Sequence, residues 1–582
     1  MKNLEDIWKE QLEKCKEQSA IIYNGRVWSY YDVDIKSSTI AANLLKKTKS
    51  PYVGVHMNNS DEYVICILGI LKAGKIFVPI DQQYPAERKI KIVENCKIDI
   101  VISDEMIHKF DCCEFVFFSD ISSGDIEQFI WRESRDAYVM HTSGSTGEPK
   151  GILIEKNSLV NLIKWFGQTF SCNKNKNMVK LARNSFDVSI EEIFGCLFNE
   201  GTLFIPEDRI RMHKKRLRKY LDENEINIVQ VVPTLLRELF DEVEKIESVK
   251  IIICGGESLS EELKNSILKK GYILYNNYGP TETTVDAMCS KCELDSPVNL
   301  GRSISNSSYV VLNEQNQRMD KNSEGELCIL GVNLAREYIN QPKLTEEKFP
   351  ILNGHRMYRT GDLVRIDELG RVIYKGRIDN QVKFHGQRIE LEEIEKAFND
   401  ICSASNCCAL FFHNAFKQRI VMFYEGSVKE EVPAIRKKLE EKVPEYMIPS
   451  EFILVQKLPE TANGKIDRKQ LKDMFECQYI SKDTSDTVGT SDISACQYDD
   501  LSKRIVQIMI EVLGTGKEDI NFELGFSEQG IDSMEYVNLI ISIEDENDIE
   551  LNDDFLLPSN FHTIHDFVLG VYSQITKSER VR

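Results

Sequence analysis

The sequence has 582 residues, of which 42% are hydrophobic and 29% are charged, and its formal net charge is −20. A chain of this length is too large for one hydrophobic core and is expected to divide into about three or four units. The strong negative charge argues against nucleic acid as a partner, because binding to phosphates requires basic surfaces.

The sequence contains no segment typical of a membrane span or a signal peptide. The longest apolar run, residues 63–80, is interrupted by two lysines, whereas a bilayer span takes about 20 apolar residues. Residues 1–14 are typical of an amphipathic acidic helix. We therefore expect a cytoplasmic protein with no membrane partner. Cys289 and Cys292 have metal-ligand spacing but no matching second pair, so we interpret the sixteen cysteines as reduced structural thiols.

Strand-like runs alternate with helical patterns between residues 40 and 292. This alternation predicts βαβ units, and hence a large α/β unit with a largely parallel sheet. The runs are 52–57, 75–80, 98–103, 138–145 and 249–259, and shorter strands follow at 325–331 and 371–377.

The C-terminal third predicts a small α+β unit, a linker and a helical unit. Strands at 407–413 and 420–426 alternate with helices at 391–400 and 435–443. A stretch with Ser, Asp and Thr and little periodicity is typical of a linker. The predicted organisation is a large unit at 1–378, a small unit at 379–476, a linker at 477–498 and an acidic helical unit at 499–577.

The strongest local signal is the string YVMHTSGSTGEPKG at residues 138–151, a strand that ends in a loop of glycines and hydroxyls. Glycines allow consecutive backbone N–H groups to turn toward one anion, and hydroxyl side chains add donors. The string does not fit the usual G-x-x-x-x-G-K-[ST] loop. It nevertheless predicts a phosphate site made of Thr142, Ser143, Gly144, Ser145, Thr146, Gly147 and Lys150.

This string resembles the phosphate-binding motif of the adenylate-forming superfamily, which includes acyl-CoA synthetases, luciferases and nonribosomal peptide synthetase adenylation domains. Further matches cover nearly the whole chain in the family's order. They are LKAGKIFVPID at 71–81, YGPTE at 278–282, YRTGDL at 358–363, GRIDNQVKFHGQRIE at 376–390 and NGKIDR at 463–468. The set is nearest to the peptide-synthetase branch. It implies a large α/β subdomain with parallel or mixed sheets, a small α+β subdomain and a four-helix carrier domain.

The resemblance implies how ATP is bound and attacked. The loop from Thr142 to Lys150 would hold the β- and γ-phosphates, and Glu282 would bind Mg²⁺, a hard cation that prefers carboxylate oxygen. Lys465 would bridge the substrate carboxylate and the α-phosphate, a task suited to an ammonium on a long stem.

The resemblance also implies a nucleoside site. Tyr278 would stack on adenine, Asn276 would reach its exocyclic amine, and Asp362 would accept the ribose hydroxyls. The residues assigned to this site are Asn276, Tyr278, Gly279, Thr281, Asp362 and Arg377.

A second half-reaction, attack of a thiol on the acyl-adenylate, is implied as well. Family enzymes rotate the small subdomain about a hinge, and Asp379 falls at that position. Residues 383–388 would then face the site, with Gly386 leaving room for a pantetheine arm. The pair Phe384 and His385 departs from the commoner aliphatic–arginine pair.

A carrier domain is indicated by Gly530-Ile-Asp-Ser533 in the acidic tail. Met534, Val537 and Ile541 recur at helical spacing, so Ser533 is predicted to open an amphipathic helix. A serine N-cap after a turn is the alternative interpretation. The string resembles the phosphopantetheine attachment site of carrier proteins, which implies 4'-phosphopantetheine on Ser533 and a phosphopantetheinyl transferase as a partner.

The stretch at 184–190, NSFDVSI, resembles the motif whose aspartate binds the α-ammonium of an amino acid. The pocket implied by motif spacing consists of Asp187, Val188, Glu191, Gln230, Ile253, Gly255, Asn277, Val285 and Asp286. Buried carboxylates are unfavourable unless they meet a cation or are protonated. Glu191 and Asp286 therefore favour a basic substrate (ornithine, lysine, arginine or a shorter diamine). In the alternative, one acid faces water and the substrate is a small polar amino acid.

These features predict ATP-dependent adenylation of an amino acid and its thioester loading onto the fused carrier. We expect an initiation or stand-alone module that passes the product to a condensation or other acceptor enzyme in trans. An acyl-CoA synthetase is the alternative, against which Ser533 and Asp187 argue. A silent nucleotide-binding scaffold would not need Lys150, Glu282 and Lys465.

Overall fold

The computed structural model shows a chain that divides by its internal contacts into two compact units, Met1–Glu393 and Ile394–Arg582. The residues that the structure describes are 2–105, 113–126, 129–144, 148–173, 175–241, 243–384, 386–402, 406–413, 418–426, 432–461, 466–480, 500–513, 520–526, 529, 531, 533–547, 549, 551, 555, 561 and 563–579. Within these residues no helix is long and apolar enough to cross a membrane.

A seven-stranded mixed sheet carries the phosphate loop. Its inner strands are parallel, while the pairs β7–β8 and β8–β18 are antiparallel. The strand order is β18 (Glu337–Tyr338), β8 (Lys150–Glu155), β7 (Asp136–Thr142), β4 (Ile76–Pro79), β3 (Tyr52–His56), β5 (Ile100–Ser103) and β6 (Glu114–Phe117).

A nine-stranded sheet carries most of the pocket residues. Its middle strands are parallel, and antiparallel strands flank them at both edges. The strand order is β15 (Arg302–Ser303), β14 (Met288–Lys291), β13 (Ile273–Tyr278), β12 (Ile251–Cys254), β11 (Ile228–Val231), β9 (Asn177–Val179), β10 (Thr202–Ile205), β1 (Ser19–Tyr23) and β2 (Arg26–Ser29).

Helices of the first unit lie between and outside these two sheets. The helix α3 (Asp61–Lys72) is apolar around its whole circumference and contacts β3 and β4 of one sheet and β1 of the other. The helices α6 (Lys156–Phe170) and α7 (Val188–Leu197) share this inner layer, α6 against β7 and β8, and α7 against β9 and β10. The inner layer therefore forms one core shared by both sheets.

A second core covers the opposite face of the nine-stranded sheet. It holds apolar residues of the helices α9 (Lys214–Glu223), α10 (Pro233–Phe240) and α11 (Glu261–Lys269). The remaining helices of the first unit are α1 (Leu4–Cys15), α2 (Tyr30–Lys47), α4 (Ala86–Cys96), α5 (Phe118–Ile121), α8 (Asp208–Arg211), η1 (Thr281–Thr283) and α12 (Pro342–Lys348). α1 and α2 each begin with a capping box, at Asn3 and Ser29.

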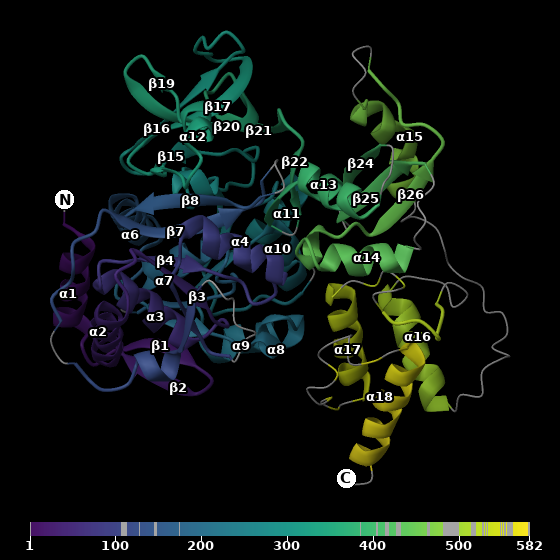
Figure 1. The fold of residues 1–582 in the computed structure, drawn as a ribbon, viewed down its shortest axis with the longest axis horizontal. Helices are drawn as coiled ribbons and strands as arrows, with labels where there is room; N and C mark the ends of the chain where they lie inside the picture. Colours follow the sequence, from purple (N-terminus) through teal and green to yellow (C-terminus); the bar gives the residue numbers. More distant parts are fainter. Residues whose placement is uncertain are drawn as a thin grey trace. The chain divides into compact units, whose positions relative to one another are not determined.

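A third, antiparallel sheet and a short hairpin complete the first unit. The sheet is drawn in teal in Figure 1 and contains β16 (Ser307–Leu312), β17 (Ser323–Gly331), β20 (His355–Ile366), β19 (Ile351–Leu352) and β21 (Val372–Arg377). The hairpin joins β22 (Gln381–Phe384) to β23 (Gln387–Glu390) and leads into α13 (Leu391–Ile401). By its contacts this hairpin belongs to the first unit.

The second unit contains an α+β portion and a helical portion. The first portion has the sheet β24 (Cys407–His413), β25 (Gln418–Glu425) and β26 (Glu451–Val455), with α14 (Val432–Glu440), η2 (Glu445–Met447) and α15 (Arg468–Ile480). The helical portion shows α16 (Asp500–Leu513), α17 (Ser533–Asn547) and α18 (Ile564–Glu579) around one apolar cluster.

The strands predicted from the sequence, and the helix predicted to begin at Ser533, are confirmed by the structure. The predicted strands correspond to β3, β4, β5, β7, β12, β17, β21, β24 and β25, and Ser533 is the first residue of α17. The two main sheets are mixed, with parallel strands in their middle. α15 extends past Cys477, where the linker was predicted to begin, and residues 481–498 lie outside the described residues. The domain boundaries and the fourth carrier helix stay predictions.

Candidate active site

The phosphate loop is the turn between β7 and β8, where Thr142 pairs with Lys150. Gly144 is required there, because a Cβ atom would lie 2.1 Å from the carbonyl oxygen of Glu148. Ser145, Thr146 and Gly147 lie outside the described residues. The loop therefore has the close backbone approach that the glycine-rich sequence predicts.

Acidic groups of the β22–β23 hairpin and of α13 bind this loop. The Lys150 Nζ atom lies 3.1 Å from Glu390 Oε1, and the backbone N–H of Gly144 donates to Glu393 Oε2 at 3.1 Å. Ser143 Oγ donates to the carbonyl oxygen of Arg388 at 2.7 Å. In this conformation the lysine and a backbone donor of the loop thus hold carboxylates, which have the charge and the acceptor oxygens of a phosphate group.

The hairpin turn packs closely against the end of β11. Gly386 has a φ of +77°, and a Cβ atom there would lie 2.6 Å from Val232 Cγ1. Its N–H donates to Glu257 Oε1 at 2.7 Å. Both the backbone conformation and the lack of space require glycine at this position. His385 lies outside the described residues.

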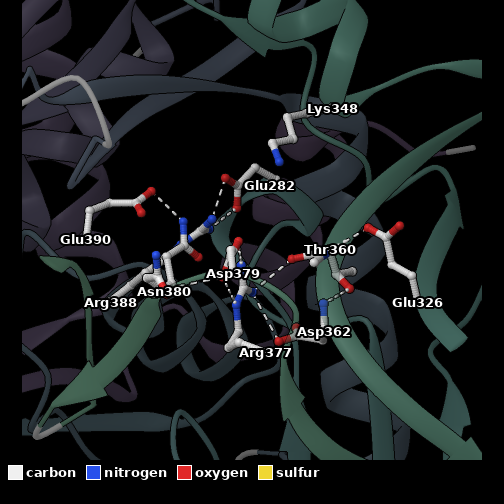
Figure 2. A network of polar contacts seen from close by, with 12 residues as sticks. Glu282, Glu326, Lys348, Thr360, Asp362, Arg377, Asp379, Asn380, Arg388 and Glu390 are labelled. Carbon is white, nitrogen blue, oxygen red and sulfur yellow. Dashed lines mark hydrogen bonds and ion pairs between the residues drawn. The ribbon is translucent and has the colours of Figure 1, made fainter. Parts of the chain in front are cut away.

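Glu282 is a buried carboxylate with charged and hydroxyl partners. Arg388 Nη1 lies 3.0 Å from Oε1 and 2.8 Å from Oε2, and the Tyr338 hydroxyl donates to Oε1 at 2.7 Å. Burial acts to raise the pKa of Glu282, but Arg388 and the Tyr338 hydroxyl outweigh it and hold the pKa below its usual value. Glu282 is therefore kept ionised, and its contact with Arg388 is drawn in Figure 2.

Three residues assigned to the nucleoside lie together. The Tyr278 hydroxyl donates to Asp362 Oδ2 at 2.5 Å, and Arg377 Nη1 donates to Asp362 Oδ1 at 3.0 Å. Arg377 also pairs with Asp379, the predicted hinge residue, so its guanidinium lies between two carboxylates (Figure 2). Asn276 Nδ2 donates to the carbonyl oxygen of Asn299, which leaves its Oδ1 as the acceptor.

Lys383 of the hairpin reaches the same region, with its Nζ atom 5.8 Å from the centre of the Tyr278 ring. Burial lowers the pKa of Lys383, and the Asp362 and Asp187 carboxylates act in the opposite direction. The hairpin therefore brings a cation close to Tyr278, one of the nucleoside residues.

Asp187 is the N-cap residue of α7. Burial raises its pKa, although the Thr281 hydroxyl and the Val188 backbone N–H stabilise the ionised form by hydrogen bonding. Thr281 thus acts on Asp187 and not only within the adenine motif.

The predicted pocket residues on the nine-stranded sheet face α7. Gln230 on β11 and Ile253 on β12 are direct partners in the sheet register, and they alternate with residues that pack in the outer core. Gln230 Nε2 donates to Glu191 Oε2 on α7 at 2.5 Å. Gly255 follows β12, and a Cβ atom there would lie 2.9 Å from the Asn277 carbonyl oxygen. The strand period thus places these side chains on one face.

The two predicted acids of the pocket are coupled. Glu191 and Asp286 are buried, the charge of Asp286 acts on Glu191, and Asn277 Nδ2 donates to Asp286 Oδ2. Burial raises the pKa of Asp286 to about 7, and burial and the Asp286 charge raise the pKa of Glu191 well above its usual value. Both carboxyl groups are enclosed, at 0% and 4% exposure, so neither is on the outer surface of the molecule.

The turn that presents Asp286 is conformationally unusual. Thr284 and Val285 have φ values of 57° and 66°, a region that β-branched residues rarely occupy. The carbonyl oxygen of Val285 would lie 2.1 Å from a Cβ atom at position 279, so Gly279 makes room for this turn. Such strain persists only where the surrounding structure enforces it, and here it fixes Asp286 beside Glu191.

The structure brings together many of the residues that the sequence assigned to this site and adds others that it did not. Glu390 and Glu393 have no role in the sequence prediction, although Glu390 ends a quoted motif. Tyr338 and Arg88 gave no sequence signal, and Arg88 Nη1 lies 2.5 Å from Glu393 Oε1. Lys465 lies outside the described residues, as does the side chain of Ser533. In the described part of the chain no three His, Cys, Asp or Glu side chains form a metal centre. A magnesium ion at Glu282 would therefore take its other ligands from phosphates and water, which is usual for this ion.

Comparisons with known proteins agree with this geometry. A family model described as AMP-binding enzyme matches residues 8–339, and one described as phosphopantetheine attachment site matches residues 503–568. Surfactin synthase subunit 2 of Bacillus subtilis (strain 168) is 35% identical over 81% of this chain and 13% of its own length. Tyrocidine synthase 1 of Brevibacillus parabrevis is 33% identical over 100% of this chain and 53% of its own length.

A solved structure shares the fold over nearly the whole chain. It is holo-PA1221, described as an NRPS protein containing adenylation and PCP domains bound to a vinylsulfonamide inhibitor, with a TM-score of 0.80 at 22% identity over 98% of this chain and 96% of that one. The chain spans about half or less of the length of the two curated relatives. The protein therefore belongs to the AMP-binding enzyme family and, with the attachment domain that follows, is homologous to the adenylation–carrier portions of nonribosomal peptide synthetases.

Proposed function

We propose that the chain adenylates an amino acid with a basic side chain and transfers the aminoacyl group to a phosphopantetheine arm on Ser533. AMP-binding enzymes of this kind use ATP with Mg²⁺, and a carrier domain bears 4'-phosphopantetheine after modification by a phosphopantetheinyl transferase. The observation that supports the substrate class is the buried carboxyl pair of Glu191 and Asp286 beside Asp187.

The first step joins the substrate carboxylate to the α-phosphorus of ATP and expels pyrophosphate, so negative charge gathers on phosphate oxygens. The Gly144 backbone and Lys150 would bind the outer phosphates, since both already hold carboxylates here. Glu282 would hold the Mg²⁺ that neutralises the leaving group. Asp362 and Asn276 offer acceptors to the ribose and the adenine amine, and Lys465 would bridge the two reacting groups.

Asp187 would bind the α-ammonium of the substrate. A free carboxylate with a raised pKa, fixed by Thr281 and the start of α7, gains a cation when the amino acid binds. This assignment distinguishes an amino-acid activator from an acyl-CoA synthetase, whose carboxylic acid substrates have no such ammonium. When attached at Ser533, phosphopantetheine would supply the thiol that attacks the aminoacyl carbonyl carbon, so that a thioester forms and AMP leaves. A condensation or other acceptor enzyme in trans would then use the product.

The test is amino-acid-dependent ATP–pyrophosphate exchange, followed by intact mass measurement of the phosphopantetheinylated protein. We expect exchange with a basic amino acid and a mass increase equal to its aminoacyl group. Asp187→Asn should raise the KM for the amino acid by about 100-fold or more, because breaking a buried ion pair costs about 3–5 kcal/mol. Exchange with none of the proteinogenic or diamino acids would refute the proposal.

A further inference from the structure

Four polar side chains of the predicted substrate pocket form a row that we call its polar wall: Gln230, Glu191, Asp286 and Asn277. The amide nitrogen of Gln230 donates to Glu191 Oε2, and the amide nitrogen of Asn277 donates to Asp286 Oδ2. The two carboxyl groups are neighbours in the middle of the row, where the charge of Asp286 helps to raise the pKa of Glu191. Both amide groups are therefore oriented with their nitrogen on a carboxylate, and their carbonyl oxygens point elsewhere.

Three buried acceptor oxygens in this row have no hydrogen-bond partner: Glu191 Oε1, Gln230 Oε1 and Asn277 Oδ1. A buried polar atom without a partner costs about 1–3 kcal/mol, so three in one wall are unfavourable unless a ligand satisfies them. All three are acceptors, and the wall around them contains two acids. The missing partner must therefore be rich in donors and positively charged.

We propose that this wall binds the terminal ammonium of an α,ω-diamino acid rather than the guanidinium of arginine. An ammonium carries three N–H donors, and α7, β11 and β13 each supply one acceptor oxygen without a partner. A guanidinium is a planar fork that is bound best by both oxygens of one carboxylate. Here Glu191 Oε2 and Asp286 Oδ2 already accept amide N–H groups, so neither carboxylate offers two free oxygens.

The coupling of the two acids supports the same ligand. Two adjacent buried carboxyl groups cannot both ionise without a cation, and one proton is shared between them instead. An ammonium placed against the pair supplies the positive charge that the proton otherwise provides. Gln230 and Asn277 are thus specificity-determining residues, because they hold the acids in position and add two acceptors of their own.

This inference rests on the proposed function and is tested with the full-length phosphopantetheinylated chain. Exchange rates are compared for 2,4-diaminobutyrate, ornithine, lysine and arginine, together with norleucine, in which a methyl group replaces the ornithine ammonium. We expect one diamino acid to exceed arginine in kcat/KM by at least about 10-fold and norleucine by at least about 100-fold, because a site built for hydrogen bonds rejects an analogue without them.

Two isosteric variants test whether the carboxyl pair causes the preference for a diamino acid over norleucine. In Asp286→Asn and Glu191→Gln, the ratio of diamino acid to norleucine should fall by at least about 10-fold, whereas the exposed control Asp120→Asn should leave it unchanged. Best exchange with arginine or norleucine, or an unchanged ratio in both variants, would overturn the inference while leaving amino-acid activation standing.

Direct binding separates this inference from the proposed function. If no amino acid supports exchange, the proposed function fails. Calorimetric titration with ornithine and norleucine then tests separately whether the pocket binds an ammonium group. Preferential binding of ornithine, lost in Asp286→Asn, would still support the ammonium site, and equal binding of the two would refute it.

Discussion

The guanidinium of Arg388 lies 2.8–3.0 Å from both carboxylate oxygens of Glu282, so the β22–β23 hairpin holds the acid that we assign to Mg²⁺. The same hairpin places Glu390 against Lys150 of the phosphate loop. Both contacts use groups that ATP and its metal would need, so this docked hairpin and a bound triphosphate compete for Lys150 and Glu282.

This competition predicts that a change in the hairpin affects adenylation and carrier loading in opposite directions. In Glu390→Gln the neutral amide no longer competes for Lys150, so the KM for ATP in pyrophosphate exchange should fall by about 2–5-fold, the range for one partly screened ion pair. Loading of the carrier should become slower, because the docked hairpin is less stable. Glu392→Gln, whose carboxylate binds Asn380 instead of the loop, is the matched control. An unchanged KM for ATP in Glu390→Gln would contradict the competition.

Lys465 is predicted from the sequence to stabilise charge during adenylation. Lys465→Ala should lower the adenylation rate by about 10²–10³, the scale for loss of one electrostatic stabiliser. Pre-steady-state measurement of adenylate formation checks this, with the exposed Lys469→Ala as a neighbouring control. Near-normal exchange in Lys465→Ala would remove this residue from the mechanism.

Ser533 opens α17 and is the proposed attachment residue. Ser533→Ala should leave pyrophosphate exchange unchanged, because adenylation does not use the carrier, and should abolish covalent loading. Intact mass spectrometry after incubation with a phosphopantetheinyl transferase, coenzyme A, ATP and amino acid reports both modifications. An aminoacyl thioester on the variant would show that the attachment residue lies elsewhere.

The carboxyl pair should make the stability of the free enzyme depend on pH. Burial raises the pKa of Asp286 from 3.8 to about 7, so between these values the folded state binds more protons than the unfolded state. Stability contributed by this group is present below about pH 4 and is lost as pH rises to about 7. The neighbouring groups that affect the pKa of Asp286 are Glu191, Asn277 and Asp187, and none of them is changed in the Asp286→Asn variant.

The measurement is the thermal unfolding midpoint from pH 5 to 8. Asp286→Asn cannot titrate, so its midpoint relative to the parent protein should increase as the pH rises toward 7 and then level off. The exposed Asp120→Asn should show no such trend. A constant difference between Asp286→Asn and the parent over this range would mean that the acid is not held protonated.

The local sequence was sufficient to predict the helices and strands and to identify a phosphate-binding loop. The loop at 142–150, the hydrophobic runs of β3, β4 and β12, and the helix that opens at Ser533 all depend on neighbouring residues, because strand period, glycine freedom and helix capping are local properties. The family resemblance carried by the ordered motifs implies the roles of Asp187, Glu282, Asp362 and Arg377.

Which of these residues meet was decided only by the tertiary structure. Glu191 and Asp286 are 95 positions apart, and they are buried neighbours because α7 packs on the face of the nine-stranded sheet that carries Gln230, while a strained turn at Val285 points Asp286 inward. Lys150 and Glu390 are brought together by the docked hairpin. Pairing energies of this kind depend on distance and burial, which no local pattern specifies. The sequence by itself determined the reactive groups, and the packing of sheets, helix and hairpin decided their partners and their protonation.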